Sequence, residues 1–414
     1  MSTETDLVND DAPSQEEILA GKQDPGVKYL REIKLSAEEK ANYESQARSW
    51  IPALVEYESS NEGWRLVSSM FRVKVWSTPK ADDSGSSLVV CRGQVSLTLD
   101  VSLELLQTQF ITVFNTSETL AEQMRASDPM SRETKILYQV PCQENEFIRI
   151  VWGSFRAAGV AWARDFCFLQ HACMTTDPST GERLFAVVAK SIERPEVPDM
   201  EKLCKRIRST ANMSGFVFRE PKGGGPIRAT YVVNVNPNGW IPNKVVNIIC
   251  NKQATNVTRV KSKMSDTAKA LTALKMEAPI FPKAVGWRQN FEFPVPRPAA
   301  GAAAANVSLK FYSTSKVSFR VRGTEAATDW TTPEASKGIC GGAWVTYPAQ
   351  TPVTVAFKVQ PETATAAGPT VSAAATGGGV VAPAAGVRAS GVVLEWKGAE
   401  WFQGFVVFYL VKVA

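Results

Sequence analysis

The segment from Thr230 to about Met264 constrains the fold most, because a strand and a long helix follow one another there with almost no linker. TYVVNVNPNGWIP has the pattern of a strand that stops at Asn-Pro-Asn-Gly, and Pro242 suits the first turn of a helix. A helix of about 23 residues is roughly 34 Å long and can cross about seven strands spaced by about 4.8 Å. We therefore expect one antiparallel sheet that grips one long helix.

The helix expected over 242–264 is amphipathic. Its apolar side chains recur at intervals of three or four residues, which is the spacing of one helix face. They include Val245, Val246, Ile249, Val257, Val260 and Met264. Positive charge surrounds the stripe at Lys244, Lys252, Arg259, Lys261 and Lys263.

The chain before this helix is mostly β in pattern. A helix over about 37–57 is expected to start at Ser36, with Glu38 and Glu39 in its first turn and a disturbance near Pro52. Alternating strands follow, and Gly93 is interpreted as a possible bulge. DVSLELLQTQFITVF and SETLAEQMR are expected to be helices, and six strands then run from KILYQVP to IRATYVVNVN.

Composition excludes several classes of function. His171 is the single histidine, so a mechanism with two histidines and a histidine-rich metal site are excluded. The seven cysteines form no CxxC pair, which favours reduced thiols. The net charge of +5 comes without a basic cluster that contains interleaved aromatics, so no nucleic-acid partner is expected. We expect no catalytic residue, no metal and no cofactor.

The two ends of the chain differ from this central part. Residues 1–30 are acidic and are expected to be disordered, without a signal peptide. No run of about 18 apolar residues occurs, so no membrane span is expected and a cytoplasmic location is favoured. After a linker at 266–284, residues 285–414 show alternating strands without a convincing helix, which predicts a β-sandwich. Two Ala/Gly/Pro-rich segments, 297–305 and 362–388, are expected to be mobile loops.

Several motifs resemble the START domain, the StAR-related lipid-transfer module, over about 37–265. They are ARDFCFLQH, VAKSIERPEVP and SGFVFREPKGGGPIRATYVVNVNPNGWIPNKVVN, in the order that the family has them. The resemblance implies an α+β helix-grip fold: a curved antiparallel sheet wrapped on a long C-terminal helix, with one lipid enclosed between them.

The resemblance also implies candidate cavity residues. The acid and the tyrosine of ceramide-carrying members fall near Asp128 and on Tyr231, while their two amide positions fall on Gly153 and Ala189, which puts ceramide in doubt. The buried acid–arginine pair of steroidogenic members falls on Val151 and Gln170. The remaining cavity candidates are Arg164, Val245, Val246 and Ile249, and the candidates for a gate or a membrane contact are Gly159, Trp162, Lys252 and Arg259. Arg164 and Asp165 are also interpreted as a structural ion pair.

The C-terminal part, 285–414, is similar to a GOLD domain in VTVAFKVQP and in VVLEWKGAEWFQGFVVFYLVKV, although Lys397-Gly398 replaces the Asp-Asn of that pattern. This resemblance implies a module that docks on a protein or a membrane. The sequence therefore predicts a lipid-binding or lipid-transfer protein with transient peripheral membrane contact and a possible protein partner. A lipid sensor that delivers no cargo, and more remotely an enzyme in the same cavity, stay as alternatives.

Overall fold

The computed structural model describes residues 24–70, 73–79, 88–142, 145–156, 162–275, 281–285, 290–295, 303–322, 327–330, 345–347, 349–350, 352–359, 379–380, 392–398 and 405–413. The chain divides into two compact units, Met1–Ser265 and Asp266–Ala414. Gly159, predicted to be part of a gate, lies outside the described residues.

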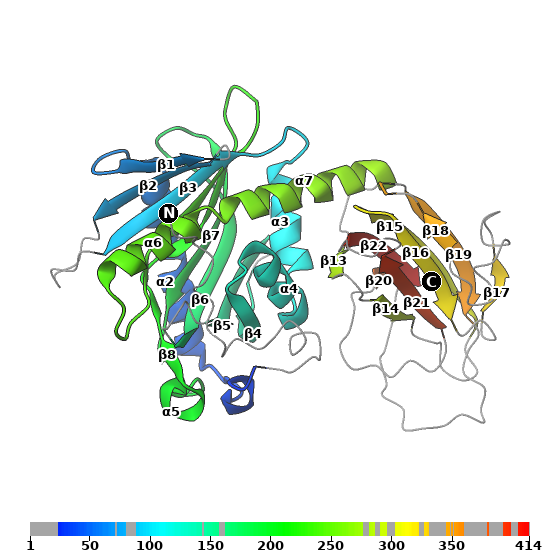
Figure 1. Ribbon diagram of the computed structural model, residues 1–414, viewed down its shortest axis with the longest axis horizontal. Coiled ribbons are helices and arrows are strands. Elements are labelled where there is room, and N and C mark those ends of the chain that lie inside the picture. Colours follow the sequence, from blue (N-terminus) through cyan, green and yellow to red (C-terminus); the bar gives the residue numbers. More distant parts are fainter. Residues whose placement is uncertain are drawn as a thin grey trace, which may run out of the picture. The chain divides into compact units, whose positions relative to one another are not determined.

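The first unit is built on one ten-stranded sheet (Figure 1). Nine strands follow the order β1-β2-β3-β11-β10-β7-β6-β5-β4, and β8 pairs in parallel with β6. Their bounds are β1 Arg65–Met70, β2 Val73–Pro79, β3 Val89–Ser96, β4 Ser131–Val140, β5 Glu146–Phe155, β6 Ala163–Thr176, β7 Arg183–Ser191, β8 Arg206–Arg208, β10 Ser214–Arg219 and β11 Arg228–Val233. The short strands β9 Thr210–Ala211 and β12 Val235–Asn236 form a separate pair. The antiparallel sheet predicted from the sequence is confirmed.

Helices cover both faces of this sheet. The helical elements of the described residues are the 3-10 turn η1 Val27–Tyr29, α2 Ala37–Ser59, α3 Leu103–Thr108 with the π-helical turn η2 Gln109–Val113, α4 Ser117–Ser127, α5 Met200–Cys204, α6 Asn243–Ala254 and α7 Val257–Leu274. Helix α2 begins with a capping box, in which Ser36 and Glu39 each accept a hydrogen bond from the other's backbone N–H. Pro52 lies inside α2 without ending it, so the helix predicted over 37–57 is present.

Successive side chains of a strand point to opposite faces of the sheet, so alternate residues face α2 and α6. Ile51 and Leu54 of α2 pack on Val188, Val217 and Val232 of β7, β10 and β11. The intervening residues of these strands, Val187, Phe216 and Tyr231, therefore point to the opposite face, where α6 lies. One sheet thus separates a solid core under α2 from the space under α6.

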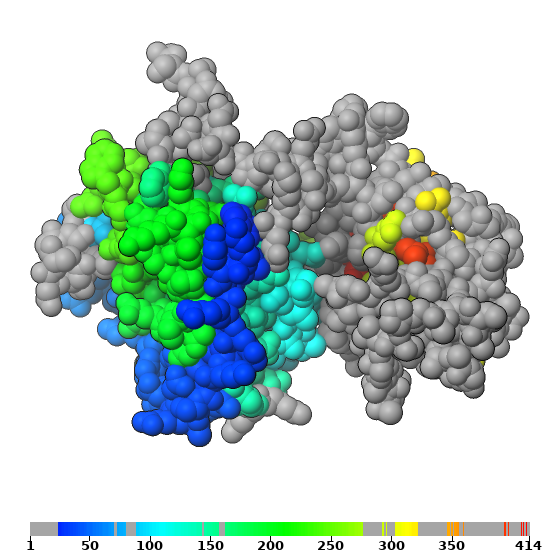
Figure 2. Space-filling view, turned by 90° about the horizontal axis from the view of Figure 1, so that it is seen from below, coloured from blue at the N-terminus to red at the C-terminus, as the bar shows by residue number. Residues whose placement is uncertain are grey.

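The N-terminal segment before α2 is held against this unit. Of the residues predicted to be disordered, 1–23 lie outside the described part, whereas Asp24 is buried and its carboxylate forms an ion pair with Arg206 at 2.8 Å. The Arg31 backbone N–H donates to the Glu196 carbonyl. Figure 2 shows this blue segment lying against the green surface that includes α5 and β8.

The single helix expected over 242–264 is wrong in detail, because α6 ends at Ala254 and α7 begins at Val257. At the interruption the Thr255 hydroxyl donates to the Lys252 carbonyl at 2.7 Å, and the Thr258 hydroxyl donates to the Thr255 carbonyl at 2.8 Å. Such local side-chain bonds compete with helical backbone bonds. The predicted linker, 266–284, contains the end of α7 and the strand β13.

The second unit contains two antiparallel sheets. One has the order β13-β22-β15-β19-β17 with β20 beside β22, and the other has the order β14-β21-β16-β18. Their bounds are β13 Phe281–Val285, β14 Asn290–Val295, β15 Ala305–Ser313, β16 Val317–Arg322, β17 Ala327–Trp330, β18 Val345–Tyr347, β19 Val353–Val359, β20 Gly379–Val380, β21 Val392–Gly398 and β22 Phe405–Val413. Buried Phe311 and Trp396, from different sheets, have ring centroids 5.8 Å apart, as in a β-sandwich.

The two segments that were predicted to be mobile loops belong to the second unit. Most of 297–305 and of 362–388 lies outside the described residues. Within them, Ala305 begins β15, and β20 at Gly379–Val380 pairs with Lys412 and Val413 of β22.

Candidate functional site

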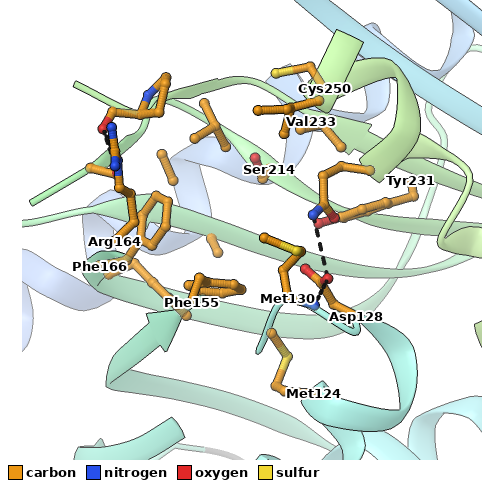
Figure 3. Close-up of a pocket in the computed structure, with 18 of the residues that line it drawn as sticks. Met124, Asp128, Met130, Phe155, Arg164, Phe166, Ser214, Tyr231, Val233 and Cys250 are labelled. Carbon is orange, nitrogen blue, oxygen red and sulfur yellow. Dashed lines mark hydrogen bonds between the residues drawn. The ribbon is translucent and has the colours of Figure 1, made fainter. Parts of the chain in front are cut away.

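An apolar cavity of about 240 Å³ lies between the sheet and α6 (Figure 3). This is far more than the roughly 10–15 Å³ that one water molecule needs. Its walls come from β5, β6, β7, β10, β11, the end of α4 and one face of α6, and most of the lining residues are apolar. The interior under α6 is therefore hollow rather than filled by side chains.

Helix α6 lies along β3, and contacts between them recur after four helix residues and two strand residues. Asn247 Oδ1 accepts from the Val89 backbone N–H at 3.2 Å, and the Cys91 thiol donates to Asn251 Oδ1 at 3.1 Å. Four helical residues rise about 6 Å and two strand residues about 6.6 Å, so these contacts repeat with little mismatch. Together they hold α6 on the sheet, over the cavity.

The next contact between β3 and α6 is made at Gly93. A Cβ at Gly93 would lie 1.9 Å from the carbonyl oxygen of Ala254, the last residue of α6. The pairing of β3 with β2 and β11 shows no register shift at Gly93, so the bulge expected there is wrong. The glycine instead permits the helix backbone to approach the strand.

One end of the cavity carries a small polar group. Asp128, the C-cap of α4, lies beside Tyr231 of β11, as Figure 3 shows. The Asp128 carboxylate accepts from the Met130 backbone N–H at 2.9 Å and from Gln253 Nε2 of α6 at 3.4 Å. Burial raises the pKa of Asp128 and also that of Tyr231. These groups can hydrogen-bond the polar part of an otherwise apolar ligand.

Arg164 and the half-exposed Trp162 lie at the edge of the cavity that we call its mouth. The Arg164 guanidinium donates to the carbonyl of Trp162, to that of Pro237 at 3.1 Å and to that of Asn238 at 3.2 Å. Asn238 and Gly239 both have positive φ, which forms the turn that ends the strand at Asn-Pro-Asn-Gly. One side chain therefore joins the start of β6 to the turn before α6.

The expected ion pair between Arg164 and Asp165 is absent from the described structure, and that interpretation was wrong. Asp165 is fully buried and accepts hydrogen bonds from Trp152 Nε1 at 2.9 Å and from Arg208. Successive residues of a strand point to opposite faces, so Arg164 and Asp165 cannot face each other. Only Arg164 lines the cavity.

Most of the predicted cavity residues do line the cavity: Asp128, Arg164, Gln170, Ala189, Tyr231, Val246 and Ile249. Trp162, a gate candidate, lines it as well and is 49% exposed. Val151 and Gly153 are not in the wall. They pair with Phe168 and Phe166, which do line the cavity, and Val151 is fully buried. Val151 and Gly153 therefore lie on the neighbouring strand, beside the wall residues of β6.

Val245 was wrongly placed in the cavity, because it is 42% exposed and does not line it. Residues 246, 249, 250 and 253 share one helix face, and position 245 lies about 100° away from 246. The same spacing places Cys250 and Gln253 on this face, and both line the cavity although neither was predicted to. Lys252 and Arg259 are exposed and do not line the cavity.

Within the described residues, the structure offers no obvious catalytic or metal centre. His171 is buried, with its ring nitrogens 3.1 Å from the Ala47 carbonyl oxygen and 2.8 Å from Glu146 Oε1, so it links α2 to β5. Burial lowers the pKa of His171. No group of three His, Cys, Asp or Glu side chains that could hold a metal ion occurs in the described part of the chain. None of the helices in that part has both the length and the apolar composition needed to cross a bilayer.

Comparison with known proteins finds a family match that covers part of the first unit. The family model of the START domain matches residues 118–270, which confirms this resemblance. A search of curated proteins found no match. Among solved structures, the human StAR-related lipid transfer protein 5 is 15% identical over 55% of this chain and 98% of its own, with a TM-score of 0.43. Human STARD10 is 17% identical over 56% and 80%, with a TM-score of 0.38. A STAR-related lipid transfer protein from Xanthomonas axonopodis is 16% identical over 49% and 99%, with a TM-score of 0.36.

Proposed function

We propose that this protein binds one lipid under α6 and transfers it between membranes, without a catalytic role. The observation that carries the proposal is the apolar cavity of about 240 Å³ in a chain that contains a START domain. Burying an acyl chain gains about 0.8 kcal/mol per CH₂, so a lipid leaves a membrane very slowly unless an apolar enclosure receives it. The cavity supplies such an enclosure.

Exposed apolar side chains beside the mouth support contact with a membrane. Trp240 is 86% exposed and lies just before α6, and Ile248 is 58% exposed and lies in the N-terminal half of α6. Trp162 is held to the same edge, because Arg164 binds the carbonyls of both Trp162 and Asn238. Tryptophan side chains favour the bilayer interface. We infer that this edge meets the membrane when lipid enters or leaves.

Native mass spectrometry with lipid extraction tests the binding proposal. We expect the purified full chain to carry about one lipid per molecule. Replacing both Val246 and Ile249 by Asp should abolish this retention, because both side chains line the cavity. Ile248→Asp lies on the exposed side of the same helix and should keep the lipid. An empty wild-type protein that turns over an ester would refute the proposal.

Transfer of labelled lipid between liposomes separates a carrier from a sensor. We expect the wild-type protein to accelerate transfer and Trp240→Ala to reduce this rate while lipid retention is unchanged. Transfer no faster than in the absence of protein would favour the sensor, which binds lipid without delivering it.

We also propose that the second unit docks the protein on a membrane or a trafficking partner, as its resemblance to a GOLD domain implies. A photocrosslinker in place of exposed Asn306 of β15 should capture a partner that the purified chain then binds directly. The matched control replaces Asn42, which is exposed on α2 in the first unit. Equal capture from both positions would contradict a docking role for this unit.

A further inference from the structure

Arg149 of β5 is a buried cation close to the cavity wall. It is 1% exposed, and its guanidinium stacks on the Phe147 ring with its carbon 4.0 Å from the ring centroid. Nη1 donates to the Phe114 carbonyl at 2.7 Å, and Nε donates to Gln170 Oε1 at 2.9 Å. Burial lowers the pKa of Arg149 to about 9, which leaves it charged at neutral pH. Among the described residues, no carboxylate forms an ion pair with this guanidinium.

The bond from Arg149 fixes the orientation of the Gln170 amide. A guanidinium has donors only, so the amide must turn its oxygen toward Arg149. The amide nitrogen is then the end that remains for the cavity, which Gln170 lines. No described residue provides an acceptor for this nitrogen. Gln170 therefore offers the cavity a hydrogen-bond donor, with an uncompensated positive charge directly behind it.

We propose that the Gln170 amide, backed by Arg149, binds the carboxylate of an acyl lipid. This inference rests on the proposed lipid binding and adds the class of head group. A carboxylate accepts the hydrogen bond from Nε2 and balances the charge of Arg149.

The position of this site suits an anion. Gln170 of β6 pairs with Ala189 of β7, and Tyr231 pairs with Phe216 of β10, so three strand spacings separate Gln170 from Tyr231. At about 4.8 Å per strand this is roughly 14 Å along the sheet. The Asp128 carboxylate lies at the Tyr231 end (Figure 3). A ligand carboxylate bound at Gln170 is therefore far from the Asp128 carboxylate, which would repel it.

Three probes with the same alkyl chain test the inference on the delipidated full chain. They are hexadecanoate, its methyl ester and protonated hexadecylamine, and dissociation constants are measured at pH 7.4 by displacement of an apolar fluorescent dye. We expect hexadecanoate to bind about tenfold or more tightly than the amine, with the ester between them. Equal affinities for the three probes would overturn the inference while leaving lipid binding intact. Absence of binding by all three would refute the proposed function itself.

Variants assign the effect to named residues. Gln170→Glu gives Arg149 a permanent carboxylate partner and removes the donor, so the preference for hexadecanoate should disappear. Arg149→Met should also remove it, and if this variant fails to fold, Gln170→Glu decides alone. The matched control is Gln139→Leu, because Gln139 pairs with Arg149 across β4 and β5 but is exposed. A preference that survives Gln170→Glu, or that Gln139→Leu abolishes equally, would contradict the assignment.

Discussion

Replacing Gly93 by alanine tests whether a close backbone approach keeps α6 closed over the cavity. The new Cβ would lie 1.9 Å from the Ala254 carbonyl oxygen and 2.7 Å from its carbonyl carbon, whereas real Cβ atoms essentially never approach closer than 3.0 Å. The end of α6 must therefore move by roughly 1 Å or more, because the strand is fixed by pairing with both β2 and β11.

The expected magnitude follows from the cost of overpacking. An extra methyl group in a well-packed site costs about 1–3 kcal/mol. If the helix moves and the sheet does not, the closed state, in which α6 covers the cavity, is destabilised by that free energy relative to the open state. The open population then rises about 5- to 150-fold. Lipid release should accelerate by a similar factor, while the sheet keeps its structure.

Cys250 provides the assay, because this thiol lines the cavity under α6 and is buried. Burial raises its pKa to about 11, so alkylation by iodoacetamide should be slow in the wild-type protein. Mass spectrometry of the peptide that contains Cys250 measures the rate, which Gly93→Ala should increase. Gly223→Ala is the control, because a Cβ there meets nothing within 4 Å. Unchanged labelling in a folded Gly93→Ala protein would show that this contact does not close α6.

Two further predictions concern stability. Glu58 is fully buried, and its carboxylate binds both Arg219 at 2.7 Å and Arg228 at 2.9 Å. Glu58→Gln should therefore lower the free energy of unfolding in urea by about 3–5 kcal/mol. A loss below about 1 kcal/mol would contradict this expectation. The folded-state pKa of His171 is lowered, so the unfolded chain binds more protons and stability should fall as the pH drops through about 6.5, the unfolded value. His171→Gln should reduce that pH dependence of the urea midpoint, and an unaltered dependence would refute the reasoning.

The fold was largely predictable from local patterns. The capping residues of α2 and the alternation of the strands fixed element type, because each depends on neighbours in the sequence. The interruption between α6 and α7 was not predicted, since the apolar stripe continues through Val257 and Val260. Its cause, the hydroxyl bonds of Thr255 and Thr258 to backbone carbonyls, is a competition that hydrophobic periodicity does not record.

The cavity was predictable in part. Val246 and Ile249, which helix spacing predicted, and Tyr231 and Ala189, which the resemblance predicted, all line the cavity. The role of Arg149 was not predicted because it depends on strand register: Arg149 pairs with Gln170 across the consecutive strands β5 and β6. Alternation assigns both residues to a face, but only the pairing brings the guanidinium to the amide. Site chemistry here depends on contacts between strands, which a single sequence leaves undetermined.

The interruption between α6 and α7 predicts how the cavity opens. The C-terminal half is fixed directly on β3, through Asn251 and the Gly93 approach to Ala254. The N-terminal half is bonded to β3 through Asn247 and Val89, and it carries the exposed Val245 and Ile248. We therefore expect α6 to pivot outward at a membrane about the interruption at 255–256, so that its N-terminal half, which carries these exposed side chains, moves farthest.

Removing the hinge tests this mode of opening. Thr255→Ala together with Asn256→Ala eliminates the side-chain bonds to Lys252 and Gln253 and favours one continuous helix, since alanine has the highest helix propensity. Circular dichroism should show equal or greater helicity, and lipid transfer between liposomes should slow because the stiffened helix swings less readily. Lipid retention should not fall, since neither residue lines the cavity. Equal or faster transfer by a protein with increased helicity would show that α6 opens by another route, such as release of its C-terminal half from β3.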